Sequence, residues 1–259
     1  MKYAIGIEYS GAAYCGWQRQ PHCDSIQQNL ETALGFVADH PIDLVCAGRT
    51  DAGVHALEQV AHFETSSERS ERAWVLGANC RLPRDIRLLW ATAVTDDFHA
   101  RFSAVARAYR YIILNAAVPS AIFNDRCSWE FRPLDHAAMH ECAQILLGEH
   151  DFSAFRAVGC QAKSASRNLH EISVTRRDQL IFLDIRANAF LYHMVRNIAG
   201  SLMAVGKGEK DRAWFAEMFA SRDRNQADVT APAAGLYFLQ ACYEDPFKLP
   251  TIARKPVLF

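Results

Sequence analysis

The chain contains 259 residues, half of them hydrophobic, and carries a formal net charge of −1. That length supports one large domain or two of ordinary size with a substantial core. No run approaches the roughly 18 consecutive apolar residues of a membrane span, and Glu8 interrupts the apolar stretch that an export signal would need. We therefore expect a cytoplasmic protein with no membrane association. The balanced charge excludes a uniformly basic nucleic-acid-binding protein, although local clusters can still form a basic face.

The eight cysteines are scattered and include no Cys-x-x-Cys pair. In a chain of this length without an export signal, such cysteines are typical of reduced thiols in the cytoplasm. We therefore expect neither disulfides nor a zinc site built from them.

The first part of the chain predicts alternating strands and helices. A period of two over residues 3–9 predicts a strand. Ser25 and Gln28, three positions apart, fit a capping box that opens an amphipathic helix. Further elements are expected as strands over 42–46, 57–63 and 86–94 and as a helix over 71–79.

Similar elements recur in the second part. Arg107, Tyr109 and Tyr111 share one face of a predicted strand, and residues 115–134 show little periodicity and predict a connection. A long apolar helix is expected over about 190–205. The other elements expected here are helices over 135–147 and 210–220 and strands over 169–174, 180–186 and 236–243.

This recurrence predicts an α+β fold built from two related units side by side. We place an N-terminal α+β half at residues 1–105 and a C-terminal α+β half at residues 106–259.

Residues 47–55 read Ala-Gly-Arg-Thr-Asp-Ala-Gly-Val-His, with Asp51 at the centre. The two glycines allow a sharp turn and the close approach of another molecule. Two interpretations of Asp51 stay open. It caps the turn, as aspartates often do, or it is a nucleophile or general base at the tip of a loop.

Arg196 lies inside the long apolar helix, at the edge of its buried face. A buried guanidinium needs a partner, and breaking such a pair costs roughly 3–5 kcal/mol. One alternative is a local partner, such as Asp184 or a carbonyl group. The other is Asp51 across the boundary between the halves, which would keep that carboxylate ionised.

Tyr109 is the third candidate. Tyrosines on strands usually serve packing, but Tyr109 has Arg107 and Arg110 beside it and is therefore suited to stack on a nucleic-acid base. Arg101, like Arg107 and Arg110, lies near an aromatic residue in the sequence. Any one of these clusters, taken alone, is typical of an ordinary solvated face.

Metal and nucleotide sites have little support. Asp51, His55 and His62 have suitable side chains, and His136 and His140 are four residues apart, but the glutamate of the His-Glu-x-x-His motif is missing. Isolated histidines are more often structural. The sequence also contains no Gly-x-Ser-x-Gly elbow, no phosphate-binding Gly-Lys-Ser/Thr loop and no Gly-x-Gly-x-x-Gly motif.

Five segments carry recognisable motifs in a fixed order: residues 14–20, 47–55, 98–103 with 107–111, 190–197 and 231–236. Together they resemble the TruA family of tRNA pseudouridine synthases over nearly the whole chain. A single Gly-Arg-Thr-Asp would be weak evidence, whereas five ordered segments are specific. The departures, such as Ala108 where the family often has a charged residue, do not touch the candidate residues.

The resemblance implies two ferredoxin-like halves with abutting antiparallel sheets and a positively charged cleft between them. It implies a homodimer that converts uridine to pseudouridine at positions 38, 39 and 40 of the tRNA anticodon stem-loop, without a metal or cofactor. Asp51 would be the nucleophile, Arg196 its ion-pair partner, and Tyr109 the residue that packs on the target base and a candidate proton acceptor. The other substrate-binding residues that it implies are Arg49, Arg107, Arg110 and Leu236.

Two other classes of function remain as alternatives. A non-catalytic RNA-binding protein on the same scaffold would keep the basic, aromatic strands but would not need Asp51. A hydrolase of glycosidic bonds usually needs two carboxylates close together, and the only further acid near the loop is Glu58.

Overall fold

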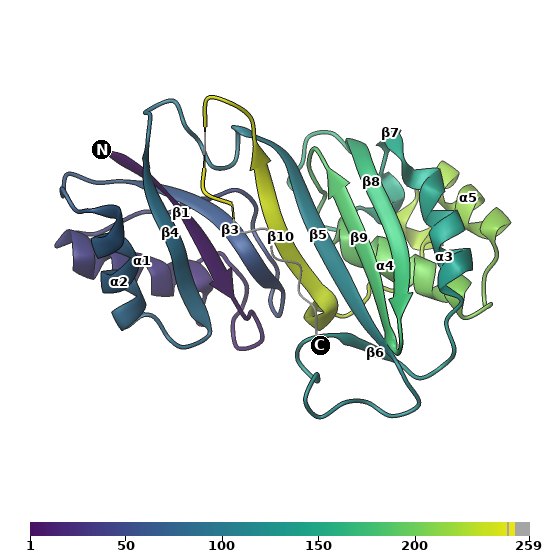
Figure 1. The fold of residues 1–259 in the computed structure, drawn as a ribbon. Coiled ribbons are helices and arrows are strands. Elements are labelled where there is room, and N and C mark those ends of the chain that lie inside the picture. Colours follow the sequence, from purple (N-terminus) through teal and green to yellow (C-terminus); the bar gives the residue numbers. More distant parts are fainter. Residues whose placement is uncertain (248, 252–259) are drawn as a thin grey trace. The chain divides into compact units, whose positions relative to one another are not determined.

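The computed structural model describes residues 1–247 and 249–251. Within them the chain forms ten strands and five α-helices, so the predicted α+β class is confirmed (Figure 1). The chain divides into two compact units. The first unit is Met1–Ala106 together with the segment that begins at Tyr237, and the second is Arg107–Leu236.

In the first unit, antiparallel strands lie in the order β4-β1-β3. Strand β2 pairs antiparallel with the end of β3, and β10 pairs parallel with its beginning. Helices α1 and α2 pack against each other, and α2 also packs against β4 (Figure 1). The elements are β1 (Lys2–Tyr9), α1 (Ile26–Ala38), β2 (Val45–Cys46), β3 (His55–Glu64), α2 (Glu71–Arg81), β4 (Ile86–Val94) and β10 (Leu236–Tyr243).

The helix cap at Ser25 and the strand at residues 3–9 form as the sequence predicts. The Ser25 hydroxyl accepts a hydrogen bond from the Gln28 backbone at 3.4 Å and opens α1. Strand β1 is flanked by β3 and β4, so nearly all of its residues are buried. The rings of Tyr3, Phe63 and Trp74 lie 5.1–5.7 Å from one another and join the sheet to α2.

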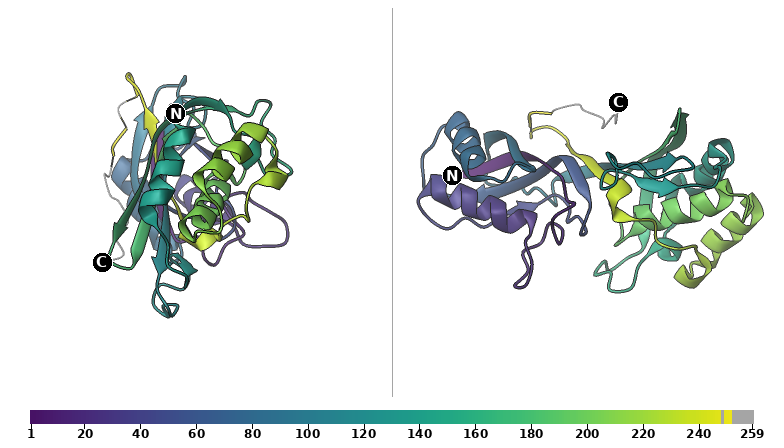
Figure 2. Two further views of the ribbon diagram at one scale, coloured as in Figure 1. Left: turned by 90° about the vertical axis from the view of Figure 1, so that its right-hand side faces the viewer. Right: turned by 90° about the horizontal axis from the view of Figure 1, so that it is seen from below.

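The second unit contains antiparallel strands in the order β5-β9-β8-β7, and the short β6 pairs parallel with β5. Its three helices gather beside this sheet (Figure 2). The rings of Phe152 and Phe155 contact those of Phe215 and Phe219, and all four side chains are buried. The elements are β5 (Ala104–Asn115), β6 (Ser128–Glu130), α3 (His136–Ala143), β7 (Gly148–Asp151), β8 (Ser166–Arg177), β9 (Leu180–Ala187), α4 (Met194–Gly206) and α5 (Arg212–Ser221).

Several boundaries differ from prediction; for example, β2 covers only Val45–Cys46 of the expected 42–46, and β8 extends beyond the expected 169–174 at both ends. The stretch 115–134 is not only a connection, because it contains β6. Helix α3 ends at Ala143 and passes into a 3-10 turn, Gln144–Leu146. Helix α4 begins at Met194 and not near residue 190, because His193 adopts a left-handed conformation with φ 59° that a continuous helix cannot contain.

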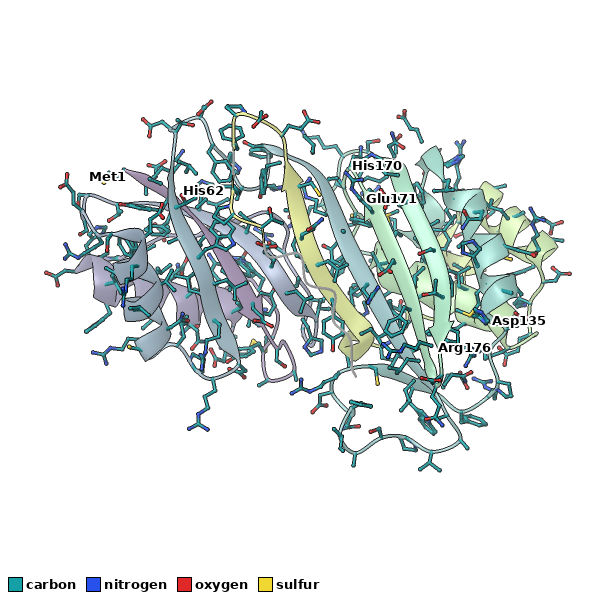
Figure 3. The ribbon with its side chains drawn as sticks, in the orientation of Figure 1. Met1, His62, Asp135, His170, Glu171 and Arg176 are labelled. Carbon is teal, nitrogen blue, oxygen red and sulfur yellow. A yellow bond between two sulfur atoms is a disulfide. The ribbon has the colours of Figure 1, made fainter. Side chains whose placement is uncertain are left out.

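His62, labelled in Figure 3, lies on β3. Its side chain is buried. Its Nδ1 accepts a hydrogen bond from the Ala100 backbone at 3.1 Å. Burial, together with the charges of His99 and Lys2, lowers the pKa of His62 to about 4.

We expect this group to make stability depend on pH. The ordinary pKa of histidine is 6.5, so between pH 6.5 and about pH 4 the unfolded chain binds a proton at His62 that the folded chain does not bind. Its contribution is therefore fully present above pH 6.5 and is lost as the pH falls towards 4, by at most about 3 kcal/mol. His62→Asn keeps an acceptor near Nδ1 but does not titrate, so it should flatten the curve. Urea unfolding at a series of pH values measures this, and parallel curves for both proteins would contradict it.

Candidate functional site

The loop that carries Asp51 joins β2 to β3 and is held along its backbone. The Ala47 amide donates to the Val60 carbonyl at 2.8 Å, and the Gln59 side-chain amide donates to the Gly48 carbonyl at 2.6 Å. The Asp51 carbonyl accepts from the Val54 amide at 3.2 Å. Gly53 has a φ of 78°, so the chain reverses immediately after Asp51. The loop thus presents Asp51, which is partly exposed, from a fixed turn.

The residue before Asp51 is anchored to the N-terminal segment. The hydroxyls of Thr50 and Tyr9 lie 2.7 Å apart in a buried hydrogen bond. The Trp17 amide donates to the Thr50 carbonyl at 3.0 Å, and the Trp17 side chain is almost fully buried. Both the backbone and the side chain of Thr50 are therefore fixed, which limits the positions that Asp51 can take.

Gly16 permits this close approach. Its φ is 95°, a conformation that other residues rarely adopt. A Cβ atom at Gly16 would lie 2.6 Å from the Thr50 carbonyl oxygen and 2.9 Å from the Asp51 carbonyl carbon. The backbone of the N-terminal loop can lie against the Asp51 loop only because this position has no side chain.

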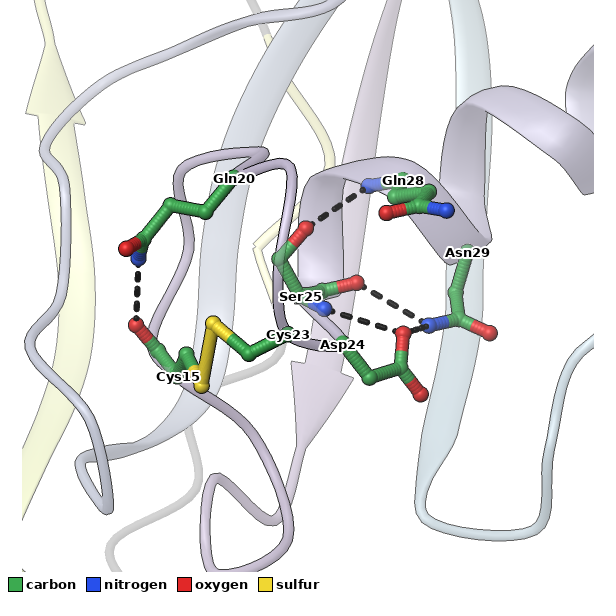
Figure 4. Close-up of a disulfide and its surroundings, with 7 residues drawn as sticks. All are labelled: Cys15, Gln20, Cys23, Asp24, Ser25, Gln28 and Asn29. Carbon is green, nitrogen blue, oxygen red and sulfur yellow. Dashed lines mark hydrogen bonds between the residues drawn. A yellow bond between two sulfur atoms is a disulfide. The ribbon is translucent and has the colours of Figure 1, made fainter.

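The same loop corrects the expectation that all cysteines are reduced thiols. Cys15 and Cys23 form a disulfide, with their Cα atoms 6.2 Å apart (Figure 4). The loop folds back on itself, because the Cys15 amide donates to the Asp24 carbonyl at 2.9 Å and Gln20 pairs with Cys23 as an isolated bridge. That return brings the two residues within disulfide range, and a spacing of eight residues gives no sign of it in the sequence. The other six cysteines are free thiols.

Gly16→Ala is expected to destabilise the fold by more than the cost of placing an alanine in a left-handed backbone conformation. The unfavourable φ costs about 1–2 kcal/mol, and the clash with Thr50 and Asp51 adds to it. Gly159→Ala is a matched control, because Gly159 has a φ of 84° and an added Cβ atom there would meet nothing within 4 Å. Urea unfolding of both variants measures the difference. Equal losses of stability would show that the contact with the Asp51 loop does not constrain position 16.

In the second unit, Tyr109 lies on β5 opposite Ile185 of β9 and is 9% exposed. Its ring meets the Phe190 ring edge-on, with centroids 4.9 Å apart. Arg107, two residues earlier on the same strand face, donates from Nη1 to the Asn188 carbonyl at 3.0 Å. Tyr109 and Arg107 are therefore positioned by the turn that precedes α4.

Arg110 points to the opposite face of the strand from Tyr109, because successive side chains alternate. It faces Asp184 directly across the β5–β9 ladder. Its Nε and Nη2 donate to the two Asp184 carboxylate oxygens at 2.7 Å each. Of the two arginines beside Tyr109, only Arg107 shares its face.

Arg196 lies in the first turn of α4, as its third residue, and is partly buried. Its Nε donates to the Ala231 carbonyl at 2.8 Å, and the Ala231 amide donates back to the Arg196 carbonyl at 3.1 Å. Gly200, one turn further along α4, lies so close to the Val229 carbonyl that a Cβ atom would overlap it. The sequence left two local partners for Arg196, a carbonyl group or Asp184. The structure shows a bond to a carbonyl group, that of Ala231, and it pairs Asp184 with Arg110. Leu236 is buried where β10 begins.

The histidines considered as metal ligands make other contacts. His55 accepts from the Gly11 amide at 3.2 Å and stacks on Tyr237. Among residues 1–247 and 249–251, no group of three or more His, Cys, Asp or Glu side chains is arranged to hold a metal ion. In the same part of the chain, no helix combines the length and apolar character needed to cross a bilayer.

Comparison with known proteins decides the family. A family model described as tRNA pseudouridine synthase matches residues 5–103 and 142–244. The chain belongs to the tRNA pseudouridine synthases. The resemblance that its sequence motifs indicate is therefore confirmed.

Full-length relatives of this synthase agree with the family match. A tRNA pseudouridine synthase A from Hydrogenovibrio crunogenus is 57% identical over 99% of this chain and 98% of that protein. Proteins with the same name from Glaesserella parasuis and Vibrio atlanticus are 51% and 52% identical over 100% and 99% of this chain, and 99% and 96% of their own lengths. A chain in a solved structure titled "Crystal Structure of a Cbf5-Nop10-Gar1 Complex" aligns with a TM-score of 0.40 and 10% identity over 91% of this chain and 48% of that one, and this likeness carries no argument.

The supports of the Asp51 loop in this synthase were missed from the sequence. Gly16 and Trp17 lie in the family-like segment 14–20, which offers the one available signal. Their contact with Thr50 joins parts of the chain more than 30 residues apart, and no local sequence pattern predicts such a contact.

Proposed function

We propose that this chain converts uridine to pseudouridine in tRNA, at positions 38, 39 and 40 of the anticodon stem-loop. The observation that carries this proposal is the near end-to-end match, at 57% identity, to a protein named tRNA pseudouridine synthase A. The positions in the stem-loop rest on the resemblance of the sequence motifs to the TruA family.

We propose Asp51 as the nucleophile of this reaction. Pseudouridine forms when the bond between uracil N1 and the ribose C1′ breaks, the uracil turns, and its C5 joins the C1′. A carboxylate that forms a transient covalent bond with the sugar or the base divides this change into easier steps. The fixed backbone around Asp51 supports this role, because a nucleophile works best in one defined position.

We propose roles for residues of both units. Tyr109 would pack on the target base after that base leaves its stack, which costs a few kcal/mol, and is a candidate acceptor for the C5 proton. Arg49, which is exposed beside Asp51, would hold the space left by the flipped nucleotide. Arg196 would be the ion-pair partner of Asp51. The further substrate-binding residues in this proposal are Arg107, Arg110 and Leu236.

The proposed reaction is balanced without a cofactor. Uridine and pseudouridine are isomers, so the net change consumes no oxidant, reductant or water. The C5–H proton of uracil leaves, and N1 gains one. An acid–base group and a nucleophile are therefore sufficient, and we propose that neither a metal nor a cofactor takes part.

We also propose that each half is ferredoxin-like. In the first unit, the order β1-α1-β2-β3-α2-β4 and the sheet order β4-β1-β3-β2 fit that topology. In the second part of the chain, β5, α3, β8, β9, α4 and β10 follow the same order with β6, β7 and α5 as additional elements, and the β5-β9-β8 pairing fits. We place the boundary near residue 105, and from the same resemblance we propose a homodimer that acts in the cytoplasm.

Release of tritium from tRNA tests the proposal against non-catalytic RNA binding. A transcript of tRNA labelled with tritium at uracil C5 loses the label to water only where C5 forms a new bond. We expect label to be released from the stem-loop uridines and mapped pseudouridine to appear at positions 38–40. Retention of tRNA without any release would identify a binding protein instead.

A further inference from the structure

The turn Phe98–Ser103, which connects β4 to β5, is held by hydrogen bonds along its backbone. Each of its six backbone N–H groups donates a hydrogen bond. The acceptors are Thr95 O for Phe98 (3.1 Å), Ser103 Oγ for His99 (3.0 Å), His62 Nδ1 for Ala100 (3.1 Å), His99 Nδ1 for Arg101 and Phe102 (3.2 Å each) and His99 O for Ser103 (2.9 Å). Two of its carbonyls are held by side chains from outside the turn, because Tyr243 donates to the Ala100 oxygen at 2.7 Å and Lys2 donates to the Phe98 oxygen at 3.3 Å.

This rigid turn presents a phenylalanine to solvent. Phe102 is 74% exposed, although the turn around it is tightly bonded. Its ring packs against the His99 ring in a tilted arrangement, with centroids 4.3 Å apart and an interplanar angle of 33°. The Arg101 guanidinium lies 5.4 Å from the centre of the same ring. The ring is therefore supported in one orientation and still offers most of its surface to another molecule.

The charges near the turn are mixed, because the exposed Asp96 and Asp97 precede it and Arg101 lies within it. Arg101 is exposed, and so is Arg49 next to Asp51. Cys46, at the end of β2, connects the two: burial raises the pKa of its thiol to about 12, and the charges of both arginines oppose that shift. Both guanidinium groups thus act on the same buried thiol, so one arginine of the turn and one of the Asp51 loop lie near the same end of β2.

We propose that this turn is a second base-stacking platform of the synthase, on which Phe102 packs against an unpaired base of the tRNA while Arg101 pairs with a neighbouring phosphate. The proposal rests on the proposed function. A planar ring offers a face to any base, and such stacking does not depend on base identity. The arginine favours a polyanion over a second, uncharged apolar surface. Because the backbone is already fixed, ordering the ring on binding costs little entropy.

Equilibrium binding of an unmodified tRNA transcript at several salt concentrations tests this platform. We expect Phe102→Leu, which keeps an apolar side chain but loses the aromatic face, to weaken binding by roughly 5- to 150-fold. The salt dependence should not change in this variant. Phe102→Tyr, which restores the ring, should bind within about twofold of the wild type. Arg101→Gln should lower the slope of log affinity against log salt by about 0.7.

Phe36 provides the matched control. It is also an exposed phenylalanine, 61% accessible, and the Arg81 guanidinium lies 3.7 Å from its ring centre on helices α1 and α2. Phe36→Leu should leave tRNA binding unchanged. Equal affinity of Phe102→Leu and the wild type, or an equal loss in Phe36→Leu, would overturn the platform. So would a change of oligomeric state in Phe102→Leu alone, which would identify the turn as a contact between copies of the chain.

The failure of this inference can be told apart from failure of the proposed function. Binding is measured without turnover, and tritium release by the wild type is measured separately. An active wild type whose Phe102→Leu variant binds normally contradicts only the platform. A wild type that binds tRNA through Phe102 but releases no tritium contradicts only the catalytic proposal.

Discussion

Asp51→Asn is expected to lower pseudouridine formation by about 10⁴-fold or more, which is the scale of loss when a covalent enzyme is deprived of its nucleophile. Asparagine fits the same space in the turn, so the hydrogen bonds at Thr50 and Val54 should persist. The amide, however, cannot form the covalent bond on which the proposed reaction depends. Affinity for tRNA should therefore stay within a few fold of the wild type.

Tritium release under single-turnover conditions measures this loss, because product release does not then limit the rate. Asp43→Asn is a suitable control, since Asp43 lies near the same loop but its side chain is 98% exposed. It should retain full activity. Turnover of Asp51→Asn near that of the control would end the case for Asp51 as nucleophile.

Arg196→Ala is expected to reduce both stability and activity. It removes the Nε donor from the Ala231 carbonyl, and stranding a partly buried acceptor costs about 1–3 kcal/mol. If Arg196 pairs with Asp51 as proposed, the nucleophile also loses its position, and displacements of this kind cost about 10²-fold or more in rate. Thermal unfolding and tritium release measure the two effects.

Two further variants separate these effects. Arg196→Lys keeps the positive charge but lacks the Nε that binds Ala231, so it should lose stability and keep part of the activity. A double-mutant cycle with Asp51→Ala should show a coupling of about 0.5–3 kcal/mol in stability. A coupling near zero would show that Arg196 and Asp51 do not interact. An unchanged melting temperature with full activity in Arg196→Ala would contradict both roles.

Much of the fold follows from short-range patterns in the sequence. The predicted strand 86–94 coincides with β4 and 236–243 with β10, because alternating or continuous apolar residues mark buried strands. Ser25 and Gln28 give the start of α1 correctly, since capping is a local interaction. Strands β6 and β7 escaped prediction because each is three or four residues long and partly exposed, too short to show a period.

Only those residues of the candidate site that lie in a sequence motif could be predicted. The Gly-Arg-Thr-Asp-Ala-Gly segment marks Asp51 directly. Nothing local shows that Tyr9 and Trp17 hold Thr50, or that Cys15 meets Cys23, because these contacts depend on how a distant loop returns. Arg110 illustrates the same limit: strand alternation already places it on the face opposite Tyr109, but only the β5–β9 pairing shows that Asp184 is its partner.

The glycine in the middle of α4 has a consequence for engineering this protein. Replacing a helical glycine with alanine normally raises stability by up to about 1 kcal/mol, so Gly200 would be an obvious choice for thermostabilisation. Here the methyl group would meet the Val229 carbonyl and push the 229–231 segment off the helix. That segment carries the carbonyl to which Arg196 is bonded. A substitution that improves the helix by every local measure would therefore loosen one of the proposed catalytic residues.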